Sequence, residues 1–292
     1  IDRPKLEVRR DTKGAITVGG IDIGGGGDDG RLSDWVLGQS EIIIRDAEVT
    51  WTDELRGAPP LALTALNFRL ANVGNRHAIG LSARPPRHLG PGVDLRAELV
   101  GRSLKQLAQW NGRVFAELGA TDLAGWRAWV DYPLEVRAGE GALRVWATLG
   151  EGAVRRATAD VALAGVVARM GKDLPLLEIT SVRGRLQGRA IGKGYEFGAR
   201  NLALTSPRAA PMNATGFRVQ WEPAEGAKPQ KGSLDANLVE LGPLVQLAEY
   251  LPLPADLRQV LAELAPQGNL LDAKLDWTGE LPDQAAYSAK MR

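Results

Sequence analysis

Apolar and polar side chains alternate with a period of two along most of the chain. Because successive side chains of a β-strand point to opposite faces, this alternation predicts strands with one apolar and one polar face. Such runs occupy residues 66–70, 79–83, 93–99, 143–149, 161–165, 217–221 and 271–277. The hydrophobic pattern therefore predicts a protein built mainly of β-strands.

Short links that contain glycine connect the predicted strands. Examples are residues 72–75, 139–141, 150–152 and 192–194. Links of about two to five residues join antiparallel neighbours, because a parallel crossover needs about a dozen residues or more. The expected topology is a long antiparallel meander. Glycine accounts for 35 of the 292 residues, above its usual share of about 7%, as expected where a sheet needs many turns, bulges and bends.

Two regions interrupt the strands with a helical period, and we place helical insertions near residues 103–130 and 243–265. In the first, Ser103 is a candidate N-cap for a short helix. In the second, apolar residues three and four apart fill residues 244–251 and 257–264, with prolines between the two runs. Since proline interrupts a helix, this pattern predicts a hairpin of two helices.

Composition excludes several classes of function. The chain has 36 Lys and Arg against 35 Asp and Glu, so no overall positive field predicts a nucleic-acid partner. It contains no cysteine, which excludes disulfides, thiolate catalysis and cysteine-based metal sites. It starts at Ile1 and has no run of about 18 apolar residues that could span a bilayer. We interpret it as an interior segment of a larger protein.

The sequence contains no recognisable catalytic or cofactor motif. His77 and His88 are the only histidines, too few for a zinc site. Residues 24–27 are all glycine but lack the Lys and Ser or Thr of a phosphate-binding loop, so residues 24–30 are expected to form a flexible loop. We expect no enzymatic activity, no cofactor and no metal. A carbohydrate-active enzyme would need two carboxylates about 5–10 Å apart in a cleft, and the sequence indicates no such pair.

The order and spacing of many residues carry a resemblance to a known family. Residues 39–86 read QSEIIIRDAEVTWTDELRGAPPLALTALNFRLANVGNRHAIGLSARPP. The matching positions in this run are Ile42, Ile43, Ile44, Ala47, Trp51, Asp53, Leu66, Phe68, Leu70, Asn72, Gly74, Arg76, His77, Pro85 and Pro86. Further matches are Leu89, Gly90, Trp110, Gly112, Asp122, Leu123, Trp126, Gly141, Leu143, Arg144, Trp146, Leu264, Ala265, Pro266 and Gly268. Over most of residues 32–278 the chain resembles the AsmA-like periplasmic proteins of Gram-negative bacteria, specifically the YhdP branch, a relative of TamB and YdbH.

This resemblance implies both a fold and a function. The implied fold is a long incurved antiparallel sheet, a groove with an apolar inner face, accompanied by a few short helices. The implied function is bridge-like transfer of phospholipids between the inner and outer membranes, without catalysis. The chain would then be an interior segment of a periplasmic groove. Its implied partners are phospholipid acyl chains, the remainder of the same large chain and, through an anchor outside this segment, the inner membrane.

Apolar strand positions are the candidates for the lining of such a groove. Each buried methylene contributes about 0.8 kcal/mol, so an acyl chain is held by buried area and needs no specific motif. Strand parity selects Leu66, Phe68, Leu70, Ile79, Leu81, Val93, Leu95, Leu143 and Val145. Parity does not determine which face is concave. The helical hairpin of residues 243–265 either covers an edge of the sheet or lies in the trough as a plug.

A second class of function fits the same pattern. The chain could be a structural or assembly scaffold of the outer membrane, whose apolar face packs only against helices or against more of the same chain. The two functions differ in how much apolar surface stays uncovered. An apolar strip that the helices do not cover would favour the lipid conduit.

Overall fold

The computed structural model describes residues 1–22, 31–132, 134–226, 228–253, 255–279 and 286–291. The predicted glycine loop of residues 24–30 lies outside this part of the chain. The chain divides into two compact units. Unit 1 comprises residues 1–131 and 142–155, and unit 2 comprises residues 132–141 and 156–292.

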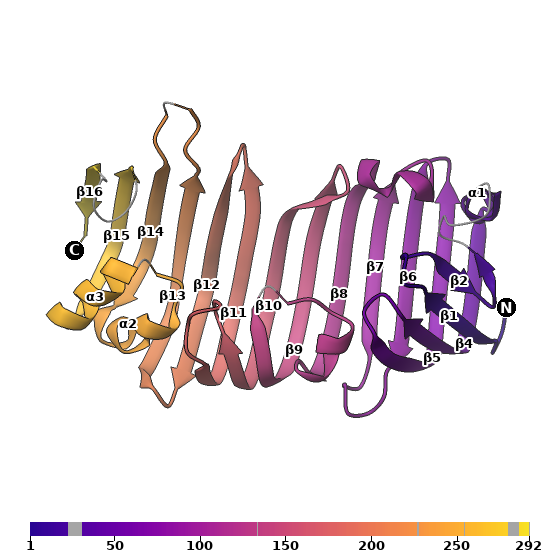
Figure 1. Ribbon diagram of the computed structural model, residues 1–292, viewed down its shortest axis with the longest axis horizontal. Coiled ribbons are helices and arrows are strands. Elements are labelled where there is room, and N and C mark those ends of the chain that lie inside the picture. The colour runs from indigo at the N-terminus through magenta and orange to yellow at the C-terminus, as the bar shows by residue number, and fades with distance from the viewer. Residues whose placement is uncertain (23–30, 133, 227, 254, 280–285, 292) are drawn as a thin grey trace. The chain divides into compact units, whose positions relative to one another are not determined.

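Unit 1 is built from strands, one α-helix and two short 3-10 helices (Figure 1). Its elements are β1 (Lys5–Arg10), β2 (Ile16–Val18), β3 (Ile21–Asp22), α1 (Arg31–Gly38), β4 (Glu41–Asp53), β5 (Ala58–Val73), β6 (Arg76–Arg84), β7 (Val93–Val100), η1 (Leu104–Gln109), β8 (Asn111–Asp122) and η2 (Gly125–Ala128). Two further strands, β9 (Glu135–Gly150) and β10 (Ala153–Arg169), contribute residues to both units.

Unit 2 contains the remaining strands and a group of helices near its C-terminal end. Its elements are β11 (Leu177–Ile191), β12 (Gly194–Ser206), β13 (Ala209–Glu222), β14 (Lys231–Glu240), α2 (Leu241–Leu247), η3 (Ala248–Tyr250), α3 (Ala255–Leu264), β15 (Asn269–Thr278) and β16 (Ala286–Lys290). The helices α2 and α3 fall where the apolar period predicts a helical hairpin.

The strands follow one another in an open sheet. Their order is β16-β15-β14-β13-β12-β11-β10-β9-β8-β7-β6-β5-β4-β1-β2-β3. From β4 onward each strand neighbours the next one in the sequence, which confirms the predicted meander. The exception is β1, which pairs with β4 in parallel. Residues 11–40 separate these two strands, which is long enough for a parallel connection, since that needs about a dozen residues or more. The predicted fold class, a mainly β protein with a few short helices, is confirmed.

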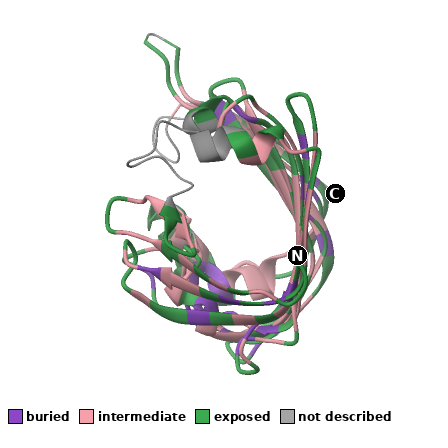
Figure 2. Cartoon of the chain, turned by 90° about the vertical axis from the view of Figure 1, so that its right-hand side faces the viewer, coloured by how far each residue is buried: buried purple, intermediate pink, exposed green. Residues whose placement is uncertain are grey.

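Irregular pairing bends the strands of each unit along their length (Figure 2). In unit 1 the register shifts beside Asp46 and Ala65, which have φ values of 51° and 47°. In unit 2 the register of β12 shifts beside Asn201, with φ of 51°. An extra residue in one strand forms a bulge that bends the strand and increases its twist. At these three bulges the chain uses residues other than the glycines that the composition suggested.

The link predicted at residues 139–141 is wrong, because β9 continues through these residues. The glycine at position 141 serves close packing between strands. A Cβ at Gly141 would lie 2.1 Å from the carbonyl oxygen of Ala162, and the backbone there has φ of 145°. A side chain is excluded on both grounds. A glycine inside a strand can therefore mark a close approach of two backbones rather than a turn.

Residues 103–130, where the apolar period predicts a helical insertion, contain less helix than expected. Only η1 and η2 are helical there, and the strand β8 occupies the residues between them. Two tryptophans of this region are buried, Trp110 at 4% and Trp126 at 8% exposure. The indole N–H of Trp126 donates to the carbonyl of Leu89 at 3.1 Å. The apolar residues spaced by three thus anchor short turns rather than a continuous helix.

Asp53 is a buried carboxylate that joins β1 to the end of β4 in unit 1. Burial alone would raise the pKa of Asp53, but the hydrogen bond from Arg10, the backbone N–H of Arg56 and the charges of both arginines together hold that pKa below its ordinary value. The Arg10 Nε donates to Asp53 Oδ1 at 2.9 Å. The unfolded state binds a proton near pH 4, so this contribution is present above that pH and is lost as the pH falls toward the folded-state pKa.

We expect Asp53→Asn to lower the stability of unit 1 at pH 7 by about 2 kcal/mol, the usual cost of a hydrogen bond to a charged group. It should also flatten the fall in stability between about pH 5 and pH 3. Thermal melts of both proteins across this pH range measure the effect. The control is Asp2→Asn, which removes an exposed ion pair with Arg45 at 3.5 Å. An unchanged acid profile in Asp53→Asn would contradict the expectation.

Candidate functional site

The candidate site is the apolar face of the sheet, beginning with unit 1. Cross-strand pairing places Phe68 opposite Leu81 and Leu81 opposite Leu95. In the adjacent row, Leu70 lies opposite Ile79. The remaining predicted positions on these strands are Leu66, two residues before Phe68, and Val93, two residues before Leu95. Both therefore lie on the same face as this set. The register therefore brings seven of the nine predicted lining residues to one face of unit 1.

Leu143 and Val145 share that face. Their neighbours on β9, Arg144 and Trp146, point to the other face of the sheet, where they contact Glu117 and Phe115 of β8. Arg144 Nε lies 2.9 Å from Glu117 Oε1, and the Trp146 ring lies 5.4 Å from the ring of Phe115. On β8 the positions of Glu117 and Phe115 alternate with those that pair with Leu95 and Ala97. Leu143 and Val145 thus lie with the apolar side chains of β6 and β7.

The apolar face of unit 1 is only partly covered. Leu66 and Leu70 are buried, whereas Phe68 and Leu81 are half-buried and pack around the core formed by Ala47, Val49, Leu66 and Ala83. The predicted lining residues thus include both core positions and partly accessible ones. Phe68, Leu81 and Leu95 also border a hollow of about 320 Å³, and Ile79 borders one of about 590 Å³, but both hollows are lined mostly by polar-face positions.

One end of this face carries a structural histidine. His77 lies two residues before Ile79 on β6, on the same face of the sheet, and is 3% exposed. Its ring stacks on Trp110 at a centroid distance of 5.1 Å. Its two nitrogens lie 2.7 Å from Asn72 Oδ1 and 3.0 Å from the carbonyl oxygen of Gly101. Both ring nitrogens have hydrogen-bond partners, so His77 has a structural role at this end of the face and is not a metal ligand.

Unit 2 has an equivalent apolar face with more exposed side chains. Pairing places Tyr195 opposite Trp221, Phe197 opposite Val219 and Leu186 opposite Ala199. Leu186 is 40%, Tyr195 51%, Phe197 58% and Trp221 38% exposed. We call these four residues the apolar strip. None of them is among the nine predicted lining residues, although residues 217–221 show the same alternation.

The helices of unit 2 cover one end of this face. Leu247 of α2 and Tyr250 of η3 form a core cluster with Val166, Leu177 and Ile179. Three partly buried residues packed against that cluster come from neighbouring strands of the sheet and are Leu163, Val182 and Leu204. This part of the hairpin therefore lies on the apolar face rather than at a sheet edge. The apolar stripe of α3 stays exposed, with Leu264 at 73%.

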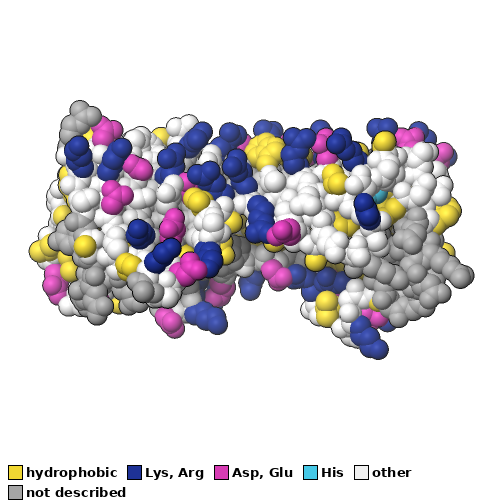
Figure 3. Space-filling view, turned by 90° about the horizontal axis from the view of Figure 1, so that it is seen from above, with side chains coloured by type: hydrophobic (Ala, Val, Ile, Leu, Met, Phe, Trp, Pro, Cys, Tyr) yellow, Lys and Arg dark blue, Asp and Glu magenta, His cyan; other side chains and the backbone are white. Residues whose placement is uncertain are grey.

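The opposite face carries charged side chains in cross-strand pairs. In unit 1, Arg113 lies 2.6 Å from Glu98, and in unit 2, Arg185 lies 2.5 Å from Asp160. Such exposed pairs contribute about 0–1 kcal/mol each. Figure 3 shows basic and acidic side chains interspersed on the surface seen from above. These charged side chains are exposed to water.

The part of the chain that the structure describes contains neither a metal site nor a membrane-spanning helix. No group of three or more histidine or acidic side chains there could hold a metal ion. No helix in that part of the chain is long and apolar enough to cross a membrane.

The fold and the apolar face define a protein with an open amphipathic β-sheet. The chain belongs to the YhdP family, since the model of that family, described as YhdP protein, matches residues 1–292. The resemblance found in the sequence is thereby confirmed. Neither the curated proteins nor the solved structures contain a match to the chain. Membership of this family indicates an envelope protein connected in general with lipid transport, and it is compatible with a location in the periplasm.

Proposed function

We propose that the apolar face is a section of a conduit that carries phospholipids between the inner and outer membranes of a Gram-negative bacterium. The single observation that supports this most is the apolar strip of unit 2, four large side chains left 38–58% exposed on one face. Contiguous exposed apolar surface of this kind marks a site for an apolar partner. In this proposal the partner is the acyl chain of a phospholipid.

The proposed mechanism needs no specific contact with the ligand. Each methylene that leaves water contributes about 0.8 kcal/mol, whichever apolar side chain it meets. An acyl chain can then move from one row of side chains to the next without losing much binding energy. The charged face of the same sheet keeps the protein in contact with water. The activity we propose is therefore non-catalytic and requires no cofactor or nucleic acid.

The proposed setting is the periplasm. There the segment continues into the remainder of a larger chain, which holds it to the inner membrane through an anchor outside these residues. The alternative, a scaffold of the outer membrane without lipid transfer, predicts that the apolar strip packs against protein.

Native mass spectrometry of the chain purified from bacterial periplasm or membranes, followed by lipid extraction, tests this proposal. We expect phospholipid to copurify with the folded protein. A folded protein without lipid, which also takes up none from phospholipid vesicles, would overturn the proposal and favour the scaffold.

A further inference from the structure

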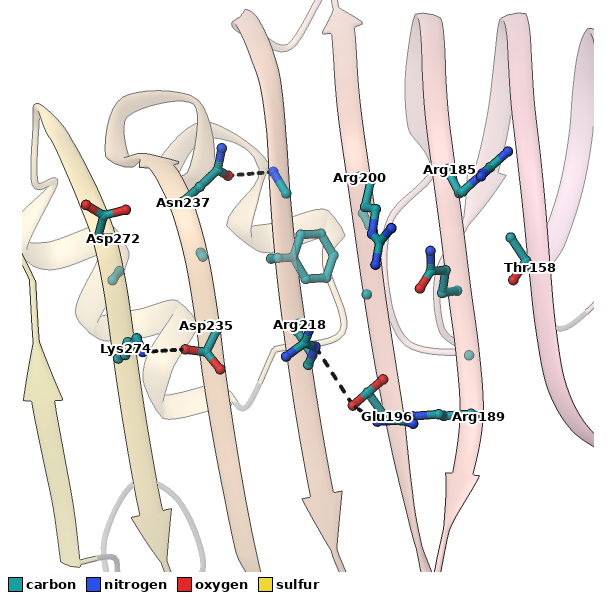
Figure 4. Close-up of a pocket in the computed structure, with 18 of the residues that line it drawn as sticks. Thr158, Arg185, Arg189, Glu196, Arg200, Arg218, Asp235, Asn237, Asp272 and Lys274 are labelled. Carbon is teal, nitrogen blue, oxygen red and sulfur yellow. Dashed lines mark hydrogen bonds and ion pairs between the residues drawn. The ribbon is translucent and has the colours of Figure 1, made fainter.

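The polar face of unit 2 contains a cavity of about 810 Å³ that the conduit does not use. Side chains from strands β10 to β15 line it (Figure 4). Its basic residues are Arg156, Arg185, Arg189, Arg200, Arg218 and Lys274. Its acidic residues are Glu196, Asp235 and Asp272. Six positive charges against three negative ones make this cavity strongly basic on a chain whose net charge is only +1.

The cavity lies on the opposite side of the sheet from the apolar strip. On β11, Val182 packs against the core beneath α2, and Arg185, three positions further on, points to the other face. On β12, Glu196 alternates with Tyr195 and Phe197 of the apolar strip. A phospholipid held by its acyl chains on the apolar face therefore cannot place its headgroup in this cavity. Any ligand of this cavity is therefore distinct from an acyl chain held on the apolar face.

Pairing between neighbouring strands sets arginines directly against one another. Arg185 lies opposite Arg200, and Arg156 lies opposite Arg189. Like charges directly opposite each other destabilise a sheet. In each pair one arginine is neutralised by an acidic side chain, Arg185 by Asp160 at 2.5 Å and Arg189 by Glu196 at 2.8 Å. The charge left in the two pairs is therefore that of Arg200 and Arg156.

The acidic side chains neutralise only part of this charge. Glu196 accepts a hydrogen bond from Arg189 at 2.8 Å and lies 3.9 Å from Arg218. The hydrogen bond from Arg189 holds the pKa of Glu196 below its ordinary value, although partial burial opposes this. Lys274 lies 3.7 Å from Asp235. Among the described residues, Arg156 and Arg200 have no ion-pair partner.

The floor of the cavity leaves room for a ligand between the arginines. Gly198 and Gly216 line it beside Arg200 and Arg218. A Cβ at Gly198 would lie 2.9 Å from the carbonyl oxygen of Phe217, so a side chain there meets backbone. Arg185, Arg200 and Arg218 come from three successive strands and line this cavity, with the side chain of Arg185 directed away from Arg200 (Figure 4).

We propose that this cavity binds a phosphate group carried as an ester. The planar guanidinium presents several N–H donors in a fixed fork that matches phosphate oxygens in bidentate geometry. A phosphate placed beside Arg200 gives that guanidinium an anionic partner, which the described side chains do not provide. The acidic residues that line the cavity limit how much negative charge enters, which favours one phosphate over a polyanion. This site is independent of the lipid conduit on the other face.

The test compares the whole chain with two charge-removing variants. Arg200→Gln and Arg156→Gln remove the two cations without ion-pair partners from the cavity. The matched control is Arg183→Gln, an exposed arginine of the same charged face of β11 that has no ion pair among the described residues and does not line the cavity. Circular dichroism melts establish that each variant is folded.

Two probes distinguish the possible sources of the phosphate. Calorimetric titration with glycerol 3-phosphate tests a soluble ester, and cosedimentation with vesicles of phosphatidylglycerol, against phosphatidylcholine, tests a lipid headgroup. We expect saturable binding of at least one probe, weakened about tenfold in Arg200→Gln and Arg156→Gln, consistent with the loss of a charge-assisted hydrogen bond, and kept in Arg183→Gln. Binding of neither probe, or an equal loss in the control, would overturn the proposal.

Failure here is distinguishable from failure of the conduit. Phe197→Asp on the apolar face should leave phosphate binding intact, because the backbone of the sheet separates the two sites. Loss of phosphate binding in that variant, while it stays folded, would contradict a separate site on the polar face.

Discussion

Phe197→Asp is expected to remove most of the phospholipid that copurifies with the chain. Phe197 is 58% exposed and lies at the centre of the apolar strip, opposite Val219. A carboxylate at this position stays in water only while the strip is empty. An acyl chain that covers it must desolvate an unpaired charge, which costs several kcal/mol. Lipid extraction with mass spectrometry should therefore show roughly a tenfold lower lipid content.

The fold should tolerate this change. Because the side chain is more than half exposed in the free protein, its replacement removes little core packing, and surface substitutions usually change stability by less than about 0.5 kcal/mol. A thermal melt within a few degrees of the parent separates loss of lipid from loss of folding.

Val154→Asp is the matched control. Val154 is 59% exposed, nearly the same as Phe197, and it carries the same change from an apolar side chain to a carboxylate. On β10 it lies four residues before Thr158, which lines the polar-face cavity, so both side chains point to the polar face. The control should retain its lipid. Equal lipid loss in both variants would point to a general effect of charge, and no loss in Phe197→Asp would remove the strip from the conduit.

The strands of this fold are predictable because alternation is a local property. A period of two in residues 66–70 or 143–149 needs no knowledge of the partner strand. Turn glycines are local signals too, and three of the four links predicted from them are confirmed. The fourth, at residues 139–141, looks identical in sequence, and only the neighbouring strand explains why Gly141 lacks a side chain.

The bulges were not predictable from the same pattern. Asp46 and Ala65 adopt positive φ without a sequence signal, since neither is glycine. Their effect on the predicted lining was small, because no bulge falls between Leu66 and Leu70 or within β6 and β7. The alternation inside each uninterrupted stretch therefore survived the bends between stretches.

The basic cavity is the feature that sequence reasoning could not reach. Arg185 and Arg200 look like ordinary residues on the wet side of two strands. That they stand directly opposite each other depends on the turn at residues 192–193 and on the register that follows from it. Residues 195–197 did carry a signal for the apolar strip, the alternation of Tyr195 and Phe197 around Glu196, but it is too short to separate a lining from a core.

Leu177→Ala should distinguish core from lining on a single strand. Leu177 is 1% exposed at the start of β11 and packs in the cluster that seats Leu247 and Tyr250. Truncating a fully buried leucine removes its transfer free energy and leaves a cavity, a loss of about 3 kcal/mol. Chemical denaturation should show this loss. Hydrogen exchange should show it as faster exchange in α2 and in the strands beneath.

Leu186→Ala makes the same truncation further along β11, where the side chain is 40% exposed in the apolar strip. Its cost to folding should be below about 1 kcal/mol, because less surface is buried and no closed cavity forms. Its effect on lipid content should be the larger of the two, since it removes apolar surface from the strip. If both variants destabilise the protein equally, Leu186 belongs to the core, and the strip is narrower than proposed.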